Sequence, residues 1–526
     1  MFRVAIRNIP LLIAALLSSP VSAQAPPPPR LVVFITVDQM KGDYFQRFDR
    51  ELTGGFRRLI DGGAWFTRAY QDHAVTETAP GHASLLSGRF PRSTGIVSNT
   101  YGVPDPHSPL IGGVGDGASP FRFRGGVLMD WMRIADPASR GLSVARKDRA
   151  AILPFGRSHQ PVFWYAGDGR FTTSTWYADT LPTWVQQFNA RRLPQSMAGR
   201  AWTLSRPESQ YPEPDNVPFE SGGTGYTFPH VLSASPDTAA SQVIDFPVMD
   251  SIVAQLALSG MRAYDLGADD HTDLLAISFS TFDAIGHDFG PDSREIHDEL
   301  LRLDGVIGAL MDSVYARVDS TRVIFALSAD HGVTRFPELV LKDTAAVREA
   351  YVDMRPALAA FRAAVAPHGI RSGEVRLSGG RLDVDVAALR RTGYDPSPEV
   401  EVFLKAARAI PGVLKATTVA DLAKGDSIND THTRRWLHML PPDANAVAVV
   451  SVKPGHVWGT AREGKHGTSN DDDAFVPIIF KGAAFRPGRY ATFTRTADIA
   501  PTLAAAIGIK PAELVDGRVL TAALRP

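Results

Sequence analysis

Three short segments of the chain are almost continuously apolar, and an aspartate stands at the end of each. They are residues 31–38, 273–283 and 322–330. Runs of this length and composition are typical of strands buried on both faces, as at the centre of a parallel sheet. Between the second and third runs, residues 293–318 carry Leu and Ile at helical spacing, and Asp292 is a candidate cap for that helix.

The rest of the pattern extends this alternation of strands and helices. Further elements are predicted as strands at 446–452 and 476–480, a hairpin at 374–386 and a helix at 497–507. The alternation predicts an α/β fold, a doubly wound, mostly parallel sheet flanked by helices, with ligands at the carboxyl edge of the strands. Two less periodic stretches, at about 155–270 and 335–450, are rich in Pro, Gly and aromatic residues. We expect them to be inserted cap regions over that edge, within one domain that covers 31–526.

The first residues have the pattern of a secretory signal. Arg3 and Arg7 precede a short apolar run, and small residues precede a cleavage site after Ala23. We therefore predict a signal peptide at 1–23, a Pro-rich leader at 24–30, and a protein secreted across the inner membrane to the periplasm or the extracellular space. The alternative is a membrane anchor, for which the apolar run is short, since a span takes about 20 residues.

Composition narrows the classes of partner and of chemistry. The 526 residues are 44% hydrophobic, enough for a large core, and the net charge of −1 argues against nucleic acid or an anionic membrane as the main partner. No later segment is apolar for long enough to cross a membrane. A membrane is therefore not expected as a partner after signal cleavage. No pattern selects an oligomer, and a monomer is consistent with the sequence. The absence of cysteine excludes Cys-ligated zinc and thiol catalysis.

Six carboxylate and imidazole side chains stand at or beside predicted strand ends or in a loop before a strand. They are Asp38, Asp283, His287, Asp330, His331 and His466. Taken singly, an Asp at a strand end is more often a turn or helix cap, and an Asp-His pair is expected by chance among 14 histidines. Oxygen and nitrogen ligands without sulfur suit zinc in sites with open positions, where the metal activates an oxygen nucleophile. The joint pattern therefore predicts a metal centre at the carboxyl edge of the sheet.

A hydroxyl group precedes a predicted helix in the segment Thr78-Ala-Pro80-Gly-His82. Pro80 near the start of a helical run is typical of a helix N-terminus. Thr78 is then either a plain N-cap, contributing roughly 1 kcal/mol, or a nucleophile that loses its proton to a nearby metal at the positive helix end. Without a metal, the cap is the better interpretation.

Two cations follow in the segment Lys147-Asp148-Arg149. If this segment is extended, Lys147 and Arg149 point the same way, and two fixed cations on one face suit the non-bridging oxygens of a phosphate monoester. A solvated charged strand is the alternative. Asn99 is a candidate amide donor to the same oxygens, and equally a good turn residue.

Taken in this order, these residues resemble the alkaline phosphatase superfamily, most closely the periplasmic two-zinc alkaline phosphatases with a Thr nucleophile and a Lys-x-Arg phosphate clamp. The matching segments run from Asp38 to about Asp498. The resemblance implies one zinc ion held by Asp283, His287 and His466, and a second held by Asp38, Asp330 and His331. It also implies that Thr78 is a ligand of the second zinc and the catalytic nucleophile, and that Asn99, Lys147 and Arg149 contact the phosphoryl oxygens. Because Lys147 stands where a third metal would act in the Ser branch, no obligatory magnesium is expected.

The function that the resemblance implies is a zinc-dependent hydrolase of small-molecule phosphate monoesters, an alkaline phosphatase with a covalent phosphothreonine intermediate. The nearest alternative is a nucleotide phosphodiesterase or pyrophosphatase of the same superfamily. The Lys147/Arg149 pair favours the monoester dianion, which carries one charge more than a diester. A sulfatase is disfavoured because Thr78 lies in no Cys/Ser-x-Pro-x-Arg context. A non-catalytic binding protein on the same scaffold is disfavoured because ligands and nucleophile are intact.

Overall fold

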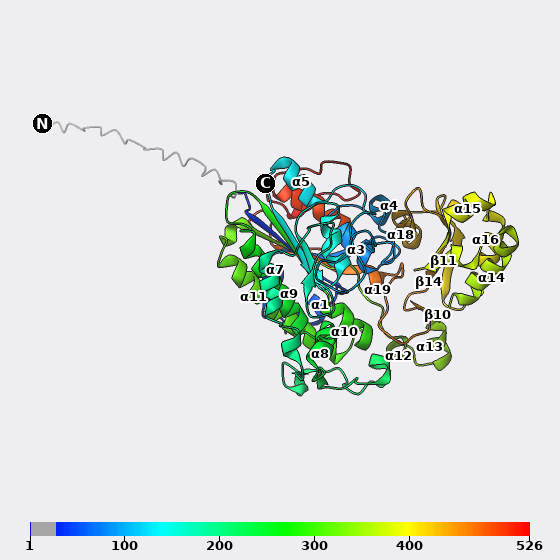
Figure 1. Cartoon of the computed structure of the whole chain (residues 1–526), viewed down its shortest axis with the longest axis horizontal. Coiled ribbons are helices and arrows are strands. Elements are labelled where there is room, and N and C mark those ends of the chain that lie inside the picture. The colour runs from blue at the N-terminus through cyan, green and yellow to red at the C-terminus, as the bar shows by residue number, and fades with distance from the viewer. Residues whose placement is uncertain (2–27, 526) are drawn as a thin grey trace.

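The computed structural model describes Met1 and residues 28–525 (Figure 1). The predicted signal peptide at 1–23 and residues 24–27 of the leader lie outside the described residues, apart from Met1. The main feature is one ten-stranded sheet with helices on both faces, and a smaller sheet lies toward one side of the molecule.

Three parallel strands form the centre of the large sheet. β1 (Leu31–Val37) lies between β8 (Asp273–Phe279) and β9 (Val323–Ser328), with Val37 opposite Phe279. All residues of the three strands are buried, and successive residues of β1 belong to different hydrophobic clusters on the two faces. This two-sided burial is why the runs are continuously apolar. The three predicted strands are confirmed, although the second ends at Phe279 rather than at residue 283.

The sheet becomes mixed toward its edges. On one side of the centre β3 (Gly141–Ala145) and β4 (Val162–Tyr165) continue in parallel, and β5 (Phe171–Thr172) pairs antiparallel with β4. On the other side β16 (Phe475–Lys481) runs antiparallel to both β9 and β2 (Ala64–Tyr70). The short strands β17 (Gly488–Tyr490) and β18 (Thr494–Arg495) pair with β2. A mostly parallel sheet flanked by helices confirms the predicted fold class, and β16 confirms the strand predicted at 476–480.

Helices pack on both faces of this sheet. One face carries α2 (Gly55–Gly62), α9 (Val248–Ala263), α10 (Thr281–Phe289) and α11 (Arg294–Tyr315). The other carries α3 (Thr78–Leu85), α5 (Leu128–Ala135), α6 (Asp148–Ile152) and α20 (Ile499–Ala506). The helices predicted at 293–318 and 497–507 are thus confirmed as α11 and α20.

The cap of α11 differs from the prediction. Ser293 Oγ accepts the N–H of Ile296 at 3.1 Å, whereas the Asp292 carboxylate pairs with Arg47 and Arg335. Asp292 stands one residue before the N-cap position, and its charge is compensated by these two arginines instead.

The range 335–450 contains a second unit with its own hydrophobic core, labelled by β11, β14, α14 and α16 in Figure 1. Its antiparallel sheet has the order β11-β12-β14-β13, with strands Val375–Ser378, Arg381–Val384, Ala446–Val452 and Val413–Thr418. Its helices are α14 (Arg355–Val365), α15 (Val386–Thr392) and α16 (Ser397–Arg408). The predicted hairpin and the strand at 446–452 are confirmed, but that strand belongs to this sheet and not to the large one.

The tip of the hairpin reaches the large domain. Gly379 and Gly380 have positive φ angles of 53° and 81°. A Cβ atom on Gly379 would lie 2.9 Å from a Val75 methyl group, so the tip packs against the segment that leads to α3. The inserted unit therefore borders the region around Thr78.

The range 155–270 belongs partly to the core, because it contains β4, β5 and α9. The rest forms α7 (Thr183–Ala190), α8 (Pro236–Gln242) and a small two-stranded sheet of β6 (Ala201–Trp202) and β7 (His230–Val231). The boundaries of both insertions stay a prediction. The short connecting elements are α1 (Tyr44–Arg47), α4 (Pro91–Thr94), α12 (Pro337–Val340), α13 (Thr344–Ala350), α17 (Val419–Leu422), α18 (Thr431–Met439), α19 (Asp471–Ala474), β10 (Tyr351–Val352) and β15 (Val457–Trp458).

Among residues 28–525, no single helix has both the length and the apolar character needed to span a membrane. The helical stretches Pro236–Asp245 and Val248–Ala263 reach that threshold by length and composition only when joined, and they are bent by 92° relative to each other.

Candidate metal centre

The first group of potential ligands comprises Asp283, His287 and His466. Asp283 and His287 lie one turn apart on α10, and His466 lies in the loop that leads to α19. His466 Nε2 is 3.2 Å from His287 Nε2 and 3.7 Å from Asp283 Oδ1. The Nδ1 atoms of His287 and His466 lie 2.6 Å and 2.7 Å from the carbonyl oxygens of Gly464 and Thr76. These contacts place a ring proton on each Nδ1 and turn both Nε2 atoms toward the same space, as in ligands around one cation.

The second group comprises Asp38, Asp330 and His331. Asp38 follows β1 and the other two follow β9, so the parallel register brings them to one edge of the sheet. His331 Nε2 is 3.5 Å from Asp38 Oδ1 and 3.6 Å from Asp330 Oδ2. Asp38 Oδ1 and His331 Nε2 are buried without a hydrogen-bond partner in the described part of the chain, whereas Asp38 Oδ2 and Asp330 Oδ2 have contacts with Lys147 and His82. Buried polar atoms without a partner are costly unless something binds them, and a cation among these side chains would satisfy them.

The two groups are neighbours, and Lys147 connects them. Lys147 Nζ is 2.7 Å from Asp38 Oδ2 and 2.5 Å from Asp283 Oδ2, so one ammonium group touches a carboxylate of each group. The rings of His331 and His466 stack with their centroids 3.7 Å apart. Lys147 Nζ also lies 3.4 Å from Thr78 Oγ1, which places that hydroxyl beside both groups.

Thr78 is held by the close approach of α3 to the loop after β9. It is the first residue of α3, and Glu77, not Thr78, occupies the N-cap position. A Cβ atom on Gly81 would lie 2.2 Å from the Asp330 carbonyl oxygen, so only glycine allows this approach. His82 Nδ1 lies 3.0 Å from Thr78 O and 3.0 Å from Asp330 Oδ2. The positive end of α3 is therefore fixed against the second ligand group.

Asn99 lies beside the same helix end. Its Oδ1 accepts the N–H of Ala79 at 2.8 Å, and its own N–H donates to Glu77 Oε2 at 2.7 Å. Because Oδ1 is held by the backbone, the NH₂ group is the end that can donate to a ligand near Thr78.

The prediction that Lys147 and Arg149 share one face of an extended segment is wrong. β3 ends at Ala145 and α6 begins at Asp148, so Lys147 precedes the helix and Arg149 lies within it. Lys147 reaches the ligand carboxylates, whereas Arg149 Nη1 lies 3.5 Å from Asp148 Oδ1. An acidic residue is favoured in the first turn of a helix by the helix dipole, which accounts for Asp148 at this boundary. Since α6 packs against α3, Arg149 still lies on a helix that contacts the Thr78 helix.

Burial and neighbouring charges set the carboxylate pKa values in opposite directions. Burial raises the pKa of Asp38, and the adjacent Asp330 carboxylate adds to that shift. Burial acts in the same direction on Asp283, but Lys147 and His287 outweigh it and hold the pKa of Asp283 well below its ordinary value. Asp283 is therefore ionised and ready to bind a cation.

The imidazoles of His287 and His466 differ in exposure and in pKa, because burial lowers the pKa of His287 but the Asp283 carboxylate raises it overall. Burial and the adjacent His331 ring lower the pKa of His466, so that ring is neutral at pH 7 and its Nε2 can act as a ligand. The His287 side chain is 37% exposed, whereas that of His466 is 8% exposed. Solvent therefore reaches the first ligand group from the side of His287.

Two residues that the sequence patterns did not single out support the centre. Gln39 Nε2 donates to Asp283 Oδ1 at 2.9 Å and its backbone N–H donates to Asp330 Oδ1 at 3.1 Å, so it holds one carboxylate of each group. Thr76 accepts from His466 through its carbonyl oxygen and donates its hydroxyl to Thr468 O at 2.9 Å. The sequence signal that could have identified them is their closeness to predicted site residues, since Gln39 follows the strand-end Asp38 and Thr76 lies two residues before Thr78.

The donor set fits divalent metal ions. In each group the potential ligand atoms lie within 4.8 Å of one another. All ligands are carboxylate oxygens or imidazole nitrogens, a set typical of zinc sites that keep open positions. Each group supplies three side chains, one fewer than the four ligands of a tetrahedral zinc ion.

The fold and the site together define the class to which the chain belongs. It matches the type I phosphodiesterase / nucleotide pyrophosphatase family over residues 32–423. Because the match covers most of the chain, the protein belongs to that family, within the alkaline phosphatase superfamily, and the resemblance inferred from the motifs is confirmed.

Individual relatives are similar over nearly their whole lengths. Alkaline phosphatase PhoK of Sphingomonas sp is 30% identical over 94% of this chain and 91% of the relative. Alkaline phosphatase PhoV of Synechococcus elongatus is 29% identical over 94% and 93%. The crystal structure of alkaline phosphatase PafA superposes with a TM-score of 0.86 at 26% identity, covering 95% of this chain and 99% of PafA.

A second structure of PafA carries substitutions of a threonine, an asparagine, a lysine and an arginine. The spacing of its Thr and Asn, and of its Lys and Arg, equals that of Thr78 to Asn99 and of Lys147 to Arg149. Murine ectonucleotide pyrophosphatase / phosphodiesterase 5 superposes with a TM-score of 0.52 at 13% identity, which is a likeness of fold alone.

Proposed function

We propose that this protein is an alkaline phosphatase, a phosphomonoester hydrolase that binds two zinc ions per chain and forms a covalent phosphothreonine at Thr78. The observation that carries the proposal is the position of Thr78 Oγ1, 3.4 Å from the Lys147 ammonium group, which touches both ligand groups. The similarity of the whole chain to three named alkaline phosphatases supports the monoester as substrate class.

The two ligand groups would hold one ion each. Asp283, His287 and His466 would bind the first, and Asp38, Asp330 and His331 the second, with Thr78 Oγ1 as a further ligand. The bound ions would supply positive charge that favours the ionised Thr78 hydroxyl and stabilises the leaving oxygen. No magnesium site is required for this arrangement.

Thr78 Oγ1 would attack phosphorus in line with the leaving alcohol, so that the Oγ–P bond forms as the P–O bond to the alcohol breaks. Water would then attack the phosphothreonine, and Thr78 Oγ1 would leave as inorganic phosphate is released. Lys147, Asn99 and Arg149 would bind the non-bridging oxygens, where charge accumulates in the transition state. The alcohol takes up the proton that Thr78 loses.

The N-terminal sequence supports export as part of this proposal. A charged start, a short apolar run and small residues before Ala23 would direct the chain across the inner membrane, with Gln24 as the first residue of the mature protein. Small-molecule phosphate esters in the periplasm or outside the cell would then be its substrates.

One specific observation favours a second candidate function, hydrolysis of phosphodiesters or nucleotide pyrophosphates. The family that the chain matches is described by those activities. A diester carries one charge less and a second organic group, so the two functions differ in what must surround the phosphoryl oxygens.

The test is the relative kcat/KM for an aryl phosphate monoester, its matched methyl diester and the aryl sulfate, with zinc supplied. We expect the monoester to be preferred by orders of magnitude, and Thr78→Ala to lose monoester turnover by several orders of magnitude while still binding zinc. A faster diester reaction would favour the second function, and near-wild-type turnover of Thr78→Ala would refute the covalent mechanism.

A further inference from the structure

A buried carboxylate outside the two ligand groups connects the loops that carry His331 and His466. Asp473 lies in the one-turn helix α19 and is fully buried. Its Oδ1 accepts the hydroxyl of Thr334 at 2.7 Å, in the loop that follows His331. Its Oδ2 accepts the N–H of Thr468 at 2.9 Å and the hydroxyl of Thr468 at 2.7 Å, two residues after His466. Each carboxylate oxygen is thus engaged by a different ligand loop.

The backbones of these loops also meet. Asp473 O accepts the N–H of Gly332 at 2.7 Å, and Thr334 N–H donates to Lys465 O at 2.9 Å. A Cβ atom on Gly332 would lie 2.5 Å from the carbonyl oxygen of Asp472, so the two backbones are in direct contact. Asp473 is thus a buried side chain that accepts hydrogen bonds from both loops, in addition to the backbone contacts between them.

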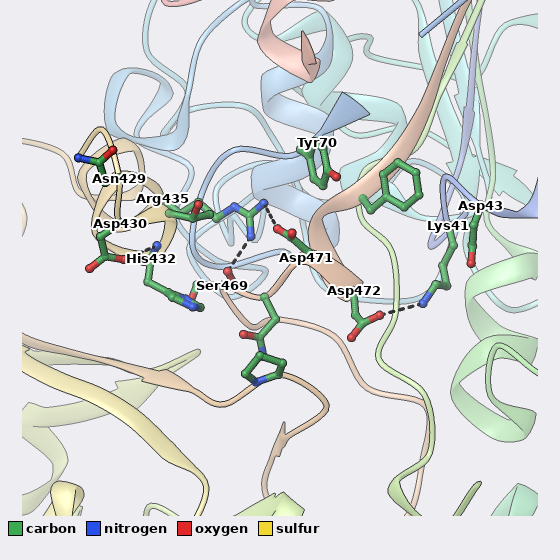
Figure 2. Close-up of a pocket in the computed structure, with 14 residues that line it drawn as sticks. Lys41, Asp43, Tyr70, Asn429, Asp430, His432, Arg435, Ser469, Asp471 and Asp472 are labelled. Carbon is green, nitrogen blue, oxygen red and sulfur yellow. Dashed lines mark hydrogen bonds and ion pairs between the residues drawn. The ribbon is translucent and has the colours of Figure 1, made fainter. Parts of the chain in front are cut away.

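The outer side of the same loop is held by different contacts (Figure 2). Arg435 donates to Ser469 O and to Asp471 Oδ1, both at 2.7 Å, and Lys41 pairs with Asp472 at 3.3 Å. The Asp471 side chain is 72% exposed and lines a pocket of about 670 Å³. Asp471 and Asp473 therefore lie on the same short helix but make contacts on opposite sides of the loop.

We propose that Asp473 is a positioning residue that sets the zinc affinity of the centre by holding His466 against the second ligand group. It acts through Thr468 and Thr334 and does not coordinate metal itself. His466 must lie within reach of His287 and Asp283 on one side and stack on His331 on the other, and the bonds from Asp473 to Thr468 restrict the conformations of the segment that carries it. The inference rests on the proposed binding of metal by the two groups.

The test compares zinc affinity in two variants of α19. Asp473→Asn keeps the shape of the side chain but replaces one acceptor oxygen by a donor, and Asp471→Asn is the control on the outer side of the same helix. We expect Asp473→Asn to raise the zinc dissociation constant about tenfold or more, on the scale of changes to residues that support metal ligands. Its kcat at saturating zinc should fall less than its zinc affinity, and Asp471→Asn should bind zinc like the wild type.

Thr334→Val is a second variant that tests the same connection while Asp473 itself is kept. It removes only the hydroxyl that joins Asp473 to the His331 loop, and a weaker affinity for zinc is expected again. If both variants lowered the melting temperature but bound zinc as tightly as the wild type, Asp473 would be structural only and the inference would be overturned. If the wild type itself bound no zinc, the proposed function would fail as well, so the two failures are distinguishable.

Discussion

Charge compensation determines how the residues around Thr78 are arranged. Three buried carboxylates, those of Asp38, Asp283 and Asp330, converge on one region, and Lys147 touches two of them. A single ammonium group cannot neutralise three buried carboxylates, and uncompensated buried charge is strongly unfavourable. This cluster of carboxylates favours the binding of further cations and is the residue-level basis for the proposed metal centre.

Lys147 and Arg149 should determine the preference for monoesters over diesters. Each charge-assisted contact is worth roughly 1.5–3 kcal/mol, so Lys147→Ala/Arg149→Ala should lower monoester kcat/KM by about a hundredfold or more. Diester hydrolysis should fall far less, because a diester presents one charge fewer. The measurement is both rates in the double variant, with its zinc content determined because Lys147 also contacts two ligand carboxylates. Equal proportional losses would show that these residues do not discriminate by charge.

Glu220 should make the stability of the protein depend on pH. Burial, with the neighbouring carboxylates of Glu295 and Asp215, raises the pKa of Glu220 from 4.5 to about 9. The folded state thus retains a proton that the unfolded chain releases, so this stabilisation is complete below pH 4.5 and is lost as the pH rises through 9. We expect Glu220→Gln to melt at a higher temperature than the wild type at pH 9, with a smaller difference at pH 5.

Thermal unfolding at the two pH values checks the Glu220 prediction. Asp237→Asn, whose side chain is 90% exposed, is the control and should leave the melting temperature unchanged at both. A Glu220→Gln curve parallel to that of the wild type would contradict the assignment of a protonated Glu220.

Elements carry these residues to the site through short connections at the ends of strands. The β1, β8 and β9 strands end at one edge, and α3 and α10 begin there. The contact between α3 and the loop after β9 is closest at Gly81, where backbone meets backbone. The position of Thr78 relative to Asp330 thus depends on the absence of a side chain at Gly81 in α3.

Gly81→Ala should therefore lower both stability and kcat, whereas a Gly→Ala substitution at an exposed helix position away from the site should raise stability. The added Cβ would meet the Asp330 carbonyl at 2.2 Å, and since backbone yields little, we expect a loss of about 1–3 kcal/mol in stability and a fall in kcat. Gly305→Ala, in the exposed middle of α11 with no atom within 4 Å of the new Cβ, should stabilise by about 0.5–1 kcal/mol. Melting temperatures and kcat of the two variants provide the check. An unaffected Gly81→Ala would show that α3 can shift without cost.

At the scale of the whole molecule, ligands from distant parts of the chain share one site. His287 and His466 are 179 residues apart in sequence, yet their Nε2 atoms lie 3.2 Å from each other. The inserted unit between them borders the core through the Gly379–Gly380 turn at Val75. Only a folded chain can present these ligands together, so metal binding and folding are linked.

Removal of zinc should consequently lower the stability of the entire domain. At free zinc a hundredfold above the dissociation constant, binding to one site adds about 2.7 kcal/mol to the free energy of unfolding. We expect the melting temperature to fall when zinc is chelated and to recover when zinc is restored. The control is the double variant Asp283→Asn/Asp330→Asn, which should respond much less to zinc. An identical response in the double variant would place the stabilising zinc elsewhere.

The elements that carry the site could be predicted where a local sequence pattern specifies them, and could not where long-range packing does. The buried strands were predictable because two-sided burial requires an unbroken apolar run, as in β1 and β9. The backbone conformation at Lys147 could not be predicted, because an alternation of charged residues fits a strand and the start of α6 equally well. The antiparallel direction of β16 and the position of His466 depend on long-range packing, which no local pattern specifies. The sequence pattern offered His466 only as a histidine in a loop before a predicted strand, and its place beside Asp283 and His287 was assigned through the resemblance.

The most direct test of the two-metal centre is anomalous diffraction at the zinc absorption edge from crystals grown with zinc. We expect two peaks, one among Asp283, His287 and His466 and one among Asp38, Asp330 and His331, with Thr78 Oγ1 coordinated at the second. A single peak, or peaks away from these six side chains, would contradict it.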